Sequence, residues 1–290
     1  MKNYLLYNPF AGGCTGEEKA RSAAERLEGE IVLTDMTKIT DYKAFIESCA
    51  GERITLCGGD GTLNRFANEI YGLDINCELY FTAAGTGNDF LKEVADGRPD
   101  AVIDLKKYIK DLPVCKVGDK KSRFINGVGY GIDGYCCEVG DKLRAAGKTK
   151  VNYAAIAVKG LLFHYKPTGA TITVDGVKHR FEKVWLAPVM KGKHYGGGMT
   201  PAPEQDRFDS EGRLSVFVFH GSGKLRTLMI FPKIFSGDHV KHTDVTKVLT
   251  GNEITVEFDS PRALQIDGET VLDVKRFTAS SAKERVIQQA

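Results

Sequence analysis

The first 113 residues alternate between short apolar runs and amphipathic segments, and this alternation limits the fold more than any other feature of the chain. Apolar runs at residues 4–7, 30–35 and 53–59 are typical of strands. Each is followed by a segment with helical spacing, and Thr15 and Gly29 suit the start and the end of the first of these helices. The pattern predicts a doubly wound, parallel α/β sheet, which binds ligands at the carboxyl ends of its strands.

The second half of the chain follows a different pattern. Short alternating runs, such as residues 214–220 and 253–258, are separated by turn signals, which predicts an all-β sandwich or barrel-like domain. One long segment of helical character, residues 147–165, interrupts these runs. We therefore expect three parts: a nucleotide-binding α/β domain at residues 1–113, a β-sandwich domain at residues 114–275, and a frayed tail at residues 276–290.

Composition excludes several classes of protein. The 290 residues are 42% hydrophobic and 27% charged, no apolar run reaches membrane-spanning length, and the N-terminus lacks signal-peptide architecture. The seven cysteines show no metal-ligand spacing, which is typical of reduced thiols in the cytoplasm. A formal net charge of +2 gives no support for nucleic-acid binding. The oligomeric state stays open, and a homodimer is compatible with the sequence.

Three turns that carry glycine or asparagine follow predicted strands, at residues 8–13, 58–62 and 84–89. Glycines let backbone N–H groups approach an anion, and the helix that follows adds its positive N-terminal end. A carboxylate such as that of Asp60 beside polyphosphate requires a metal ion or a transferable proton. The alternative is a tight turn whose Asp caps a helix. Two such turns in one sheet favour phosphate binding, although neither matches the common phosphate-loop or dinucleotide motifs.

Four segments, NPFAGG, GGDGTLN, GTGNDF and IDGE, occur in this order along nearly the whole chain. Together they resemble the diacylglycerol kinase catalytic family, in particular its bacterial soluble lipid kinases. The GGDGT segment also occurs in NAD kinases, whereas GTGNDF separates the lipid kinases from them. The resemblance implies an N-terminal nucleotide domain, a C-terminal β sandwich and an active site in the cleft between them.

The same resemblance implies roles for individual residues of the N-terminal half. Asp60 would be catalytic and would act through Mg²⁺. Arg65 departs from the family, which often has Glu at this place, so a metal role there is in doubt, although an Arg side chain could contact phosphate. The implied nucleotide-binding set is Asn8, Pro9, Phe10, Ala11, Gly12, Thr34, Gly58, Gly59, Gly61, Thr62, Leu63, Asn64, Arg65, Thr86, Asn88 and Asp89.

A second acidic segment lies in EQDRFDSEGR, residues 204–213. The resemblance implies a Mg²⁺ ion with a chiefly structural role, held by the carboxylate of Glu211 and the backbone carbonyls of Phe208 and Arg213. Asp206 and Asp209 lie close enough in sequence to replace Glu211. The alternative is an acidic, solvated turn before a strand, because a hard cation requires several converging oxygens.

The LQIDGE segment predicts two carboxylates at a strand end. Asp267 and Glu269 alternate with apolar residues, and Gly268 between them allows a sharp turn. The resemblance implies that Glu269 accepts the proton of the substrate hydroxyl and that Asp267 binds metal or tunes Glu269. The alternative is a plain hairpin turn, for which Asp-Gly is a frequent signal.

These features together predict an ATP- and Mg²⁺-dependent kinase that phosphorylates a hydroxyl of a membrane lipid, with diacylglycerol giving phosphatidic acid as the first expectation. Such a cytoplasmic enzyme would contact the membrane surface transiently. Residues 153–167 are apolar enough to face a membrane, flanked by Lys148, Lys150, Lys159 and Lys166, but we favour a core helix there. The rival functions are an NAD kinase-like kinase of soluble metabolites and a non-catalytic nucleotide-binding regulator.

Overall fold

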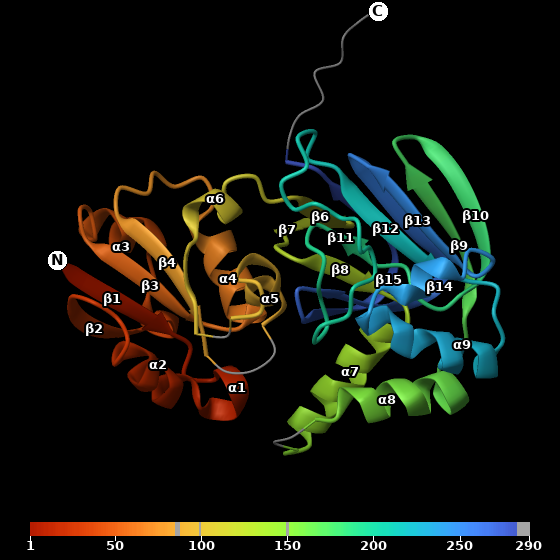
Figure 1. The fold of residues 1–290 in the computed structure, drawn as a ribbon, viewed down its shortest axis with the longest axis horizontal. Helices are drawn as coiled ribbons and strands as arrows, with labels where there is room; N and C mark the ends of the chain where they lie inside the picture. The colour runs from red at the N-terminus through yellow and green to blue at the C-terminus, as the bar shows by residue number, and fades with distance from the viewer. Residues whose placement is uncertain (85–87, 99, 149–150, 283–290) are drawn as a thin grey trace, which may run out of the picture. The chain divides into compact units, whose positions relative to one another are not determined.

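The computed structural model describes residues 1–84, 88–98, 100–148 and 151–282 (Figure 1). The chain forms two compact units, Met1–Lys110 and Asp111–Ala290. The division follows Lys110, whereas the sequence placed it at residue 113. Among the described residues, no helix combines the length and the hydropathy needed to span a bilayer.

The N-terminal unit contains a five-stranded sheet in the order β2-β1-β3-β4-β5. Every neighbouring pair is parallel except β4 with β5, which returns antiparallel at the edge. The central strands are apolar on both faces, and Leu5, Leu6, Leu56 and Phe81 are fully buried. The strands are β1 (Lys2–Tyr7), β2 (Glu30–Asp35), β3 (Arg53–Gly58), β4 (Glu78–Ala83) and β5 (Val102–Asp104). This confirms the predicted α/β fold with a mostly parallel sheet.

Helices alternate with these strands, as the sequence pattern predicted. Asp41 caps α3, because its carboxylate accepts the N–H of Ala44 at 3.0 Å. The helices are α1 (Ala11–Cys14), α2 (Gly16–Ala24), η1 (Met36–Lys38), α3 (Tyr42–Ser48), α4 (Asp60–Ile70), α5 (Asp89–Val94) and α6 (Lys106–Ile109). The helices α4 and α5 begin directly after β3 and shortly after β4, so both N-termini lie at the carboxyl edge of the sheet.

The C-terminal unit is an antiparallel β sandwich, as predicted. Its strands are β6 (Val114–Val117), β7 (Lys120–Arg123), β8 (Gly127–Tyr130), β9 (Thr168–Val174), β10 (Val177–Val184), β11 (Val189–Met190), β12 (Leu214–Phe219), β13 (Thr246–Gly251), β14 (Glu253–Ile266) and β15 (Glu269–Ser280). The long strand β14 pairs with β8, β9 and β15. A register shift between Glu257 and Arg262, next to Pro261, lets it pass from β9 to β8.

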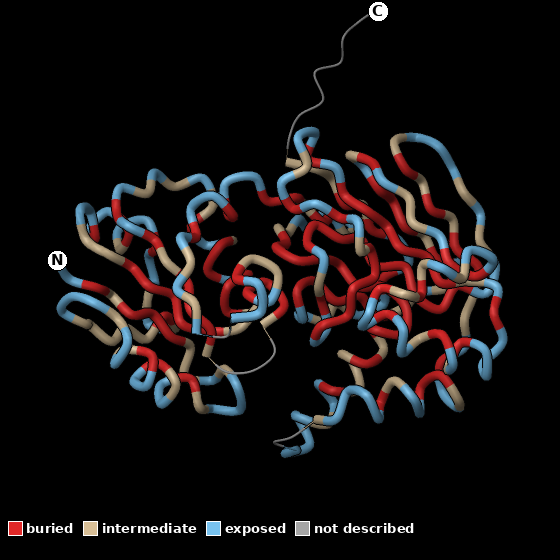
Figure 2. The backbone as a smooth tube through the Cα atoms, viewed as in Figure 1, coloured by how far each residue is buried: buried red, intermediate tan, exposed pale blue. Residues whose placement is uncertain are grey.

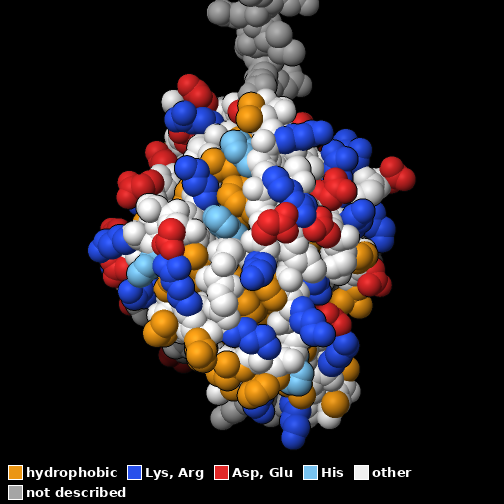
Figure 3. Space-filling view, turned by 90° about the vertical axis from the view of Figure 1, so that its right-hand side faces the viewer, with side chains coloured by type: hydrophobic (Ala, Val, Ile, Leu, Met, Phe, Trp, Pro, Cys, Tyr) orange, Lys and Arg blue, Asp and Glu red, His pale blue; other side chains and the backbone are white. Residues whose placement is uncertain are grey.

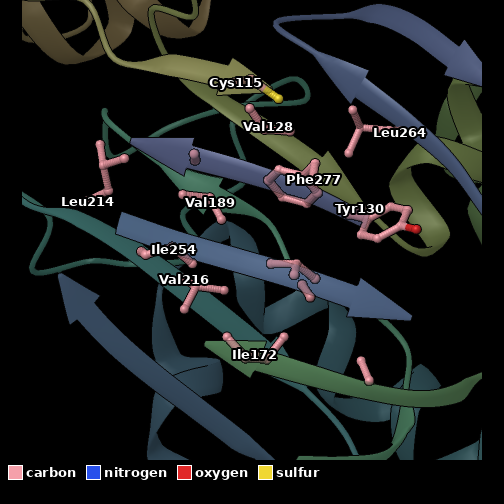
Figure 4. Packing of buried hydrophobic residues seen from close by; sticks show 14 of the residues in the cluster. Cys115, Val128, Tyr130, Ile172, Val189, Leu214, Val216, Ile254, Leu264 and Phe277 are labelled. Atoms are coloured by element: carbon pink, nitrogen blue, oxygen red, sulfur yellow. The ribbon is translucent and has the colours of Figure 1, made fainter. Parts of the chain in front are cut away.

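Alternating residues of these strands form the core of the C-terminal unit (Figure 4). The Tyr130 ring lies edge-on to Phe258 and Phe277, with centroids 4.4 and 5.5 Å away. Buried positions follow the strands along the chain (Figure 2). Phe277 and Ala279 belong to this core, so the tail expected at residues 276–290 is wrong for its first part, because β15 continues to Ser280 and pairs with β14 and β6.

The helices of the C-terminal unit differ most from the sequence expectation. The predicted segment 147–165 contains α8 (Tyr153–Lys159) and the π-helical η2 (Gly160–His164). The helices α7 (Ile132–Ala145), α9 (Lys224–Ile230), η3 (Phe231–Phe235) and η4 (Asp238–Lys241) were not predicted. Gly134 and Gly140 lower the helical propensity of α7, yet close packing requires them: a Cβ on Gly134 would clash with the Ala263 carbonyl, and one on Gly140 would lie 2.8 Å from the Tyr153 ring.

Candidate active site

The turn after β1 exposes backbone at the carboxyl edge of the sheet. Asn8 orders its start, because its side-chain oxygen accepts the Phe10 N–H at 3.0 Å and its carbonyl accepts the Ala11 N–H at 3.1 Å. Gly12 and Gly13 follow with φ of 60° and 77°, and both are exposed. Successive residues in such conformations aim N–H groups into a common concavity that suits an anion. Within the predicted segment Asn8, Pro9, Phe10, Ala11 and Gly12, the Phe10 and Ala11 N–H groups are already bonded and Pro9 has none, so Gly12 is the member whose backbone suits phosphate contact.

Lys19 is a site candidate that the sequence reasoning missed. It lies on α2, where its N–H bonds the Thr15 carbonyl at 3.1 Å. A Cβ on Gly12 would lie 2.8 Å from the Lys19 Nζ, which places the ammonium group over the glycine turn. The signal in the sequence is the spacing of Lys19, which follows Thr15 by four residues and so lies one helical turn beyond the glycine segment.

Asp60 connects the turns after β3 and β4. Its two carboxylate oxygens accept the N–H groups of Asp89 at 2.8 Å and Phe90 at 3.0 Å, the first residues of α5. Asn88 caps the same helix through the Leu91 N–H at 2.8 Å, and its amide reaches the Gly58 carbonyl at 3.4 Å. The two turns that the sequence predicted as neighbours are therefore held together, and Asp60 binds the start of α5 rather than capping α4, the helix that its own turn precedes.

The N-terminus of α4 has backbone geometry suited to an anion. The first N–H of its helical ladder is that of Leu63, which bonds the Gly59 carbonyl at 3.0 Å. The N–H groups of Gly61 and Thr62 therefore lie in the first turn, where the helix itself provides no acceptor and its dipole is positive. Gly58 packs so closely that a Cβ there would lie 2.6 Å from Thr62 Cβ.

The remaining members of the predicted nucleotide set fall into different environments. Leu63 is fully buried with its N–H already bonded, so it positions the turn and has no group left for phosphate. The side chains of Thr62, Asn64 and Asp89 are also buried, while Arg65 is exposed. The hydroxyl of Thr34 donates to the Val32 carbonyl at 3.1 Å. Thr86 lies outside the described residues.

In the C-terminal unit, Asp267 is an internal anchor. Its carboxylate accepts three backbone N–H groups, those of Ile125 at 2.5 Å, Asn126 at 2.9 Å and Gly127 at 3.0 Å, and only 8% of the residue is exposed. Arg207, which is also buried, holds the same segment through the Ile125 carbonyl at 2.5 Å and the Asn126 side chain at 2.9 Å. The sequence reasoning missed Arg207, because nothing local marks it as buried.

Glu269 lies directly after Asp267 and Gly268, at the start of β15. Ile266 pairs with Glu269, so Asp267 and Gly268, with φ of 45° and 98°, form a two-residue hairpin turn. The hairpin alternative therefore holds for the local geometry. Glu269 is exposed, whereas Asp267 is turned inward. Of the two predicted carboxylates, Glu269 is the one accessible to a substrate.

A series of hydrogen bonds between buried polar side chains connects this hairpin to Asp133 and Tyr195. The Gly268 N–H donates to Gln265 Oε1 at 2.6 Å, and the Gln265 side chain also hydrogen-bonds Asp133. The Tyr195 hydroxyl donates to Asp133 Oδ2 at 3.1 Å, while Asp133 Oδ1 has no hydrogen-bond partner within the described part of the chain. Burial raises the pKa of Asp133 from 3.8 to about 6.

This raised pKa gives a testable pH dependence. Because the unfolded chain releases the Asp133 proton near pH 4 and the folded chain near pH 6, ionisation costs the folded state about 3 kcal/mol above that range. Between about pH 4 and pH 7, we therefore expect the unfolding free energy of the parent to fall by about this amount, whereas that of Asp133→Asn lacks this decrease. Urea unfolding at a series of pH values measures the difference, and parallel curves would contradict the assignment.

The loop from Asp206 to Arg213 is organised by an ion pair. Asp209 Oδ1 accepts the N–H groups of Glu211 and Arg213, both at 3.0 Å, and the Arg213 guanidinium lies 2.8 Å from Asp209 Oδ2. These contacts lower the pKa of Asp209 to about 2. The Arg213 carbonyl, a predicted metal ligand, accepts Gln205 Nε2 at 3.1 Å.

The carboxylates of Asp209 and Glu211 already face the positive charge of Arg213. The Arg213 guanidinium neutralises the Asp209 carboxylate. Glu211 is exposed, and its Oε2 lies 3.5 Å from Arg213 Nε. Within the described ranges, no cluster of three His, Cys, Asp or Glu residues could hold a metal. The metal role that the resemblance implies for Glu211 and the carbonyls of Phe208 and Arg213 stays a prediction, and the Arg213 guanidinium would compete with a cation for the carboxylates of this loop.

Two substitutions test the ion pair. We expect Asp209→Ala to lower the unfolding free energy by about 1–2 kcal/mol near neutral pH, since two backbone N–H groups and the guanidinium lose their acceptor. The depressed pKa means that this contribution is present above about pH 4 and is lost as the pH falls toward 2. Glu211→Ala is the matched control and should remain within about 0.5 kcal/mol. An EDTA-sensitive melting temperature would contradict an ion pair acting alone and favour the predicted metal ion.

Comparison with known proteins adds family information to this geometry. Residues 2–117 match the diacylglycerol kinase catalytic domain, and residues 126–280 match the YegS C-terminal NAD kinase beta sandwich-like domain. Curated relatives named diacylglycerol kinase are 27% identical in Bacillus subtilis, covering 91% of this chain and 88% of the relative, and 24% identical in Mycobacterium tuberculosis, covering 88% and 84%. A crystal structure of a diacylglycerol kinase from Bacillus anthracis has the same fold, with a TM-score of 0.63, 22% identity and coverage of 97% and 94%.

Proposed function

Because the chain belongs to the diacylglycerol kinase family of lipid kinases, we propose that it transfers the γ-phosphate of ATP to a hydroxyl group of a membrane lipid. Diacylglycerol, with phosphatidic acid as the product, is the acceptor that the names of its relatives favour. The proposal assigns binding of the triphosphate to the N-terminal unit and removal of the hydroxyl proton to the C-terminal unit.

The observation that carries the proposal is the connection of the GGDGT turn to the start of α5 through Asp60. This connection fixes the α4 N-terminus and the NDF segment relative to each other at one edge of the sheet. The N–H groups of Gly61 and Thr62 and the ammonium of Lys19 supply positive charge suited to a polyphosphate. Phosphoryl transfer relies mainly on such positioning and charge stabilisation.

The proton of the acceptor hydroxyl requires a base, and Glu269 is the candidate. It is exposed at the first residue of β15, and the hairpin before it is held by Gln265 and Asp267. Asp267 would act as a positioning residue, because its carboxylate is occupied by backbone N–H groups. A carboxylate on a rigid hairpin can take up the proton without rearrangement of the chain.

Mg²⁺ enters this proposal as the cation that accompanies the ATP polyphosphate. The Asp60 carboxylate belongs to the proposed phosphate-binding turn at the start of α4 and is the group that we propose acts through this cation. Bound there, the cation would neutralise charge that develops on the transferred phosphoryl group.

The direct test is incubation of the purified protein with labelled ATP and a panel of acceptors, followed by chromatographic identification of the product. The panel holds diacylglycerol, monoacylglycerol, ceramide and sphingosine in mixed micelles, with NAD and glycerol as soluble acceptors. Labelled phosphatidic acid is the expected product. Phosphorylation of NAD alone would indicate a soluble-metabolite kinase, and no ATP consumption with any acceptor would favour a nucleotide-binding regulator.

A further inference from the structure

A cavity lies in the C-terminal unit beside the point where β14 changes its partner. The strand pairs with β9 up to Phe258 and with β8 from Leu264 onward. Pro261, between these two residues, lines the cavity together with Tyr165 and residues of α7. The cavity volume is about 250 Å³, far more than a single water molecule fills, so a small molecule can enter it.

A β-bulge forms one wall of this cavity. Arg262 and Leu264 of β14 both have partners on β15, with Ala263 between them. On β15, two residues, Leu272 and Asp273, occupy the same interval. Asp273 has a φ of 55°, a conformation that Asn and Asp adopt more readily than most residues with a side chain. Both bulge residues line the cavity, so the bulge brings the Asp273 carboxylate to its wall.

Two residues that line the cavity hold buried polar atoms without a partner. The Tyr165 hydroxyl and Arg262 Nε are both buried, and neither forms a hydrogen bond within the described part of the chain. Burial raises the pKa of Tyr165, so its hydroxyl stays protonated and can donate. The Arg262 guanidinium lies 5.2 Å from the centroid of the Tyr165 ring and donates to the Lys166 carbonyl at 2.8 Å, which fixes its orientation. An unsatisfied buried donor costs free energy, and a bound acceptor in the cavity would remove that cost.

The cavity wall carries charges of both signs. Three ionised side chains line it, Arg262, Glu138 and Asp273, besides the imidazole of His164. Glu138 pairs with Lys142 at 2.5 Å, whereas neither Arg262 nor Asp273 forms an ion pair with another described residue. A purely anionic ligand would face the two carboxylates, and a purely cationic one would face the guanidinium. The lining therefore favours a ligand that carries both an anionic and a cationic group.

Charge away from the cavity gives no preference for either sign. The formal net charge of the chain is only +2, and Figure 3 shows a face of the molecule on which Lys and Arg side chains are interspersed with Asp and Glu side chains. A surface of this kind provides no long-range attraction for a ligand of one sign. Selection of a ligand therefore depends on the groups that line the cavity, and ordered water is the alternative occupant.

We propose that this cavity binds a small soluble zwitterion, a molecule with one ammonium group and one carboxylate or phosphate group. The anionic group accepts hydrogen bonds from Arg262 Nε and the Tyr165 hydroxyl, and the ammonium group binds the carboxylates of Asp273 and Glu138. Glu269, the proposed base, does not line the cavity, so this is a second site. Binding there requires neither ATP nor a lipid, and it can be measured whether or not the proposed kinase function holds.

The test is isothermal titration calorimetry of the full chain with L-serine and phosphoethanolamine, two zwitterions that differ in their anionic group. Acetate, inorganic phosphate and ethanolamine are the comparison probes, because each carries charge of one sign only. We expect saturable binding of at least one zwitterion, and at least tenfold weaker binding of the probes that carry one sign of charge.

Two substitutions remove one side of the site each. Tyr165→Phe should lower the affinity for the zwitterion about tenfold, because one hydrogen bond to a charged group is lost. Its melting temperature without ligand should not fall, since the hydroxyl has no hydrogen-bond partner among the described residues. Asp273→Asn should also lower the affinity about tenfold, and Asn suits the positive φ at this position, so the bulge should remain.

Each substitution has a matched control outside the cavity. Tyr42→Phe removes a buried hydroxyl that donates to the Met36 carbonyl at 3.2 Å, so it should lower the melting temperature and leave the affinity unchanged. Asp96→Asn alters an exposed Asp with a φ of 49° and should change neither quantity. No saturable binding of either zwitterion would leave water as the occupant of the cavity and overturn the proposal. Equal affinity of the parent, Tyr165→Phe and Asp273→Asn, or equally tight binding of acetate or ethanolamine, would overturn it as well.

Discussion

Glu269→Gln is expected to lower steady-state turnover by ~10²–10⁴-fold with little change in ATP affinity, because a positioned general base contributes a factor of that size. The substitution keeps the size of the side chain and removes its capacity to hold the proton. Glu269 makes the pair with Ile266 through backbone, so the hairpin should remain intact. Steady-state kinetics with diacylglycerol micelles gives the turnover, and equilibrium binding of ATP gives the affinity.

Two other carboxylates serve as comparisons for this result. Glu253→Gln alters an exposed acid at the start of β14 and should leave turnover unchanged. Asp267→Asn should lower both turnover and the unfolding free energy, the latter by about 2–3 kcal/mol, because an amide cannot accept all three N–H groups of residues 125–127. If Asp267→Asn is inactive at the parent melting temperature while Glu269→Gln turns over normally, the base is Asp267.

Asp60→Asn is expected to lower turnover by more than about 100-fold and the unfolding free energy by about 1–2 kcal/mol. The loss of turnover is expected because the substitution removes the negative charge beside the cation that we propose accompanies ATP. The loss of stability follows from geometry, since the amide oxygen can keep one of the N–H bonds from Asp89 and Phe90 while the amide nitrogen faces the other. Turnover and urea unfolding are measured on the same preparation.

The control for Asp60 must remove a helix cap without touching the proposed phosphate-binding turns. Asp41→Ala does so, because Asp41 caps α3 through the Ala44 N–H at 3.0 Å. It should cost about 1 kcal/mol of unfolding free energy and leave turnover close to that of the parent. Equal losses of turnover in the two variants would assign the effect of Asp60→Asn to reduced stability and would exclude a role in catalysis.

Local signals in the sequence were enough to locate most elements of the N-terminal unit. The run EIVLTD became β2 with the same bounds, and the GGDGT segment lies where β3 ends and α4 begins. Hydrophobic period, glycine and cap residues act over a few neighbouring positions, so they can be read without the rest of the chain. The same signals placed the three glycine- or asparagine-bearing turns at the carboxyl ends of strands.

Local signals failed where packing overrode propensity. The helix α7 contains Gly134 and Gly140, which a sequence pattern reads as helix breakers, but their missing side chains let the helix approach Ala263 and Tyr153. The runs at residues 253–258 and 263–266 are typical of separate strands, yet both belong to the single strand β14, which passes the interruption at Pro261 by a change of partner from β9 to β8.

The roles of the acidic residues were decided by tertiary structure alone. The sequence by itself determined that Asp60, Asp267 and Glu269 stand at strand ends in glycine turns. Only the fold decided that Asp60 caps α5, that Asp267 turns inward to residues 125–127, more than 100 positions earlier in the chain, and that Arg213 meets Asp209. A carboxylate binds whichever donors the strand order brings within hydrogen-bond distance, and strand order is set by the packing of the whole unit rather than by neighbours in sequence.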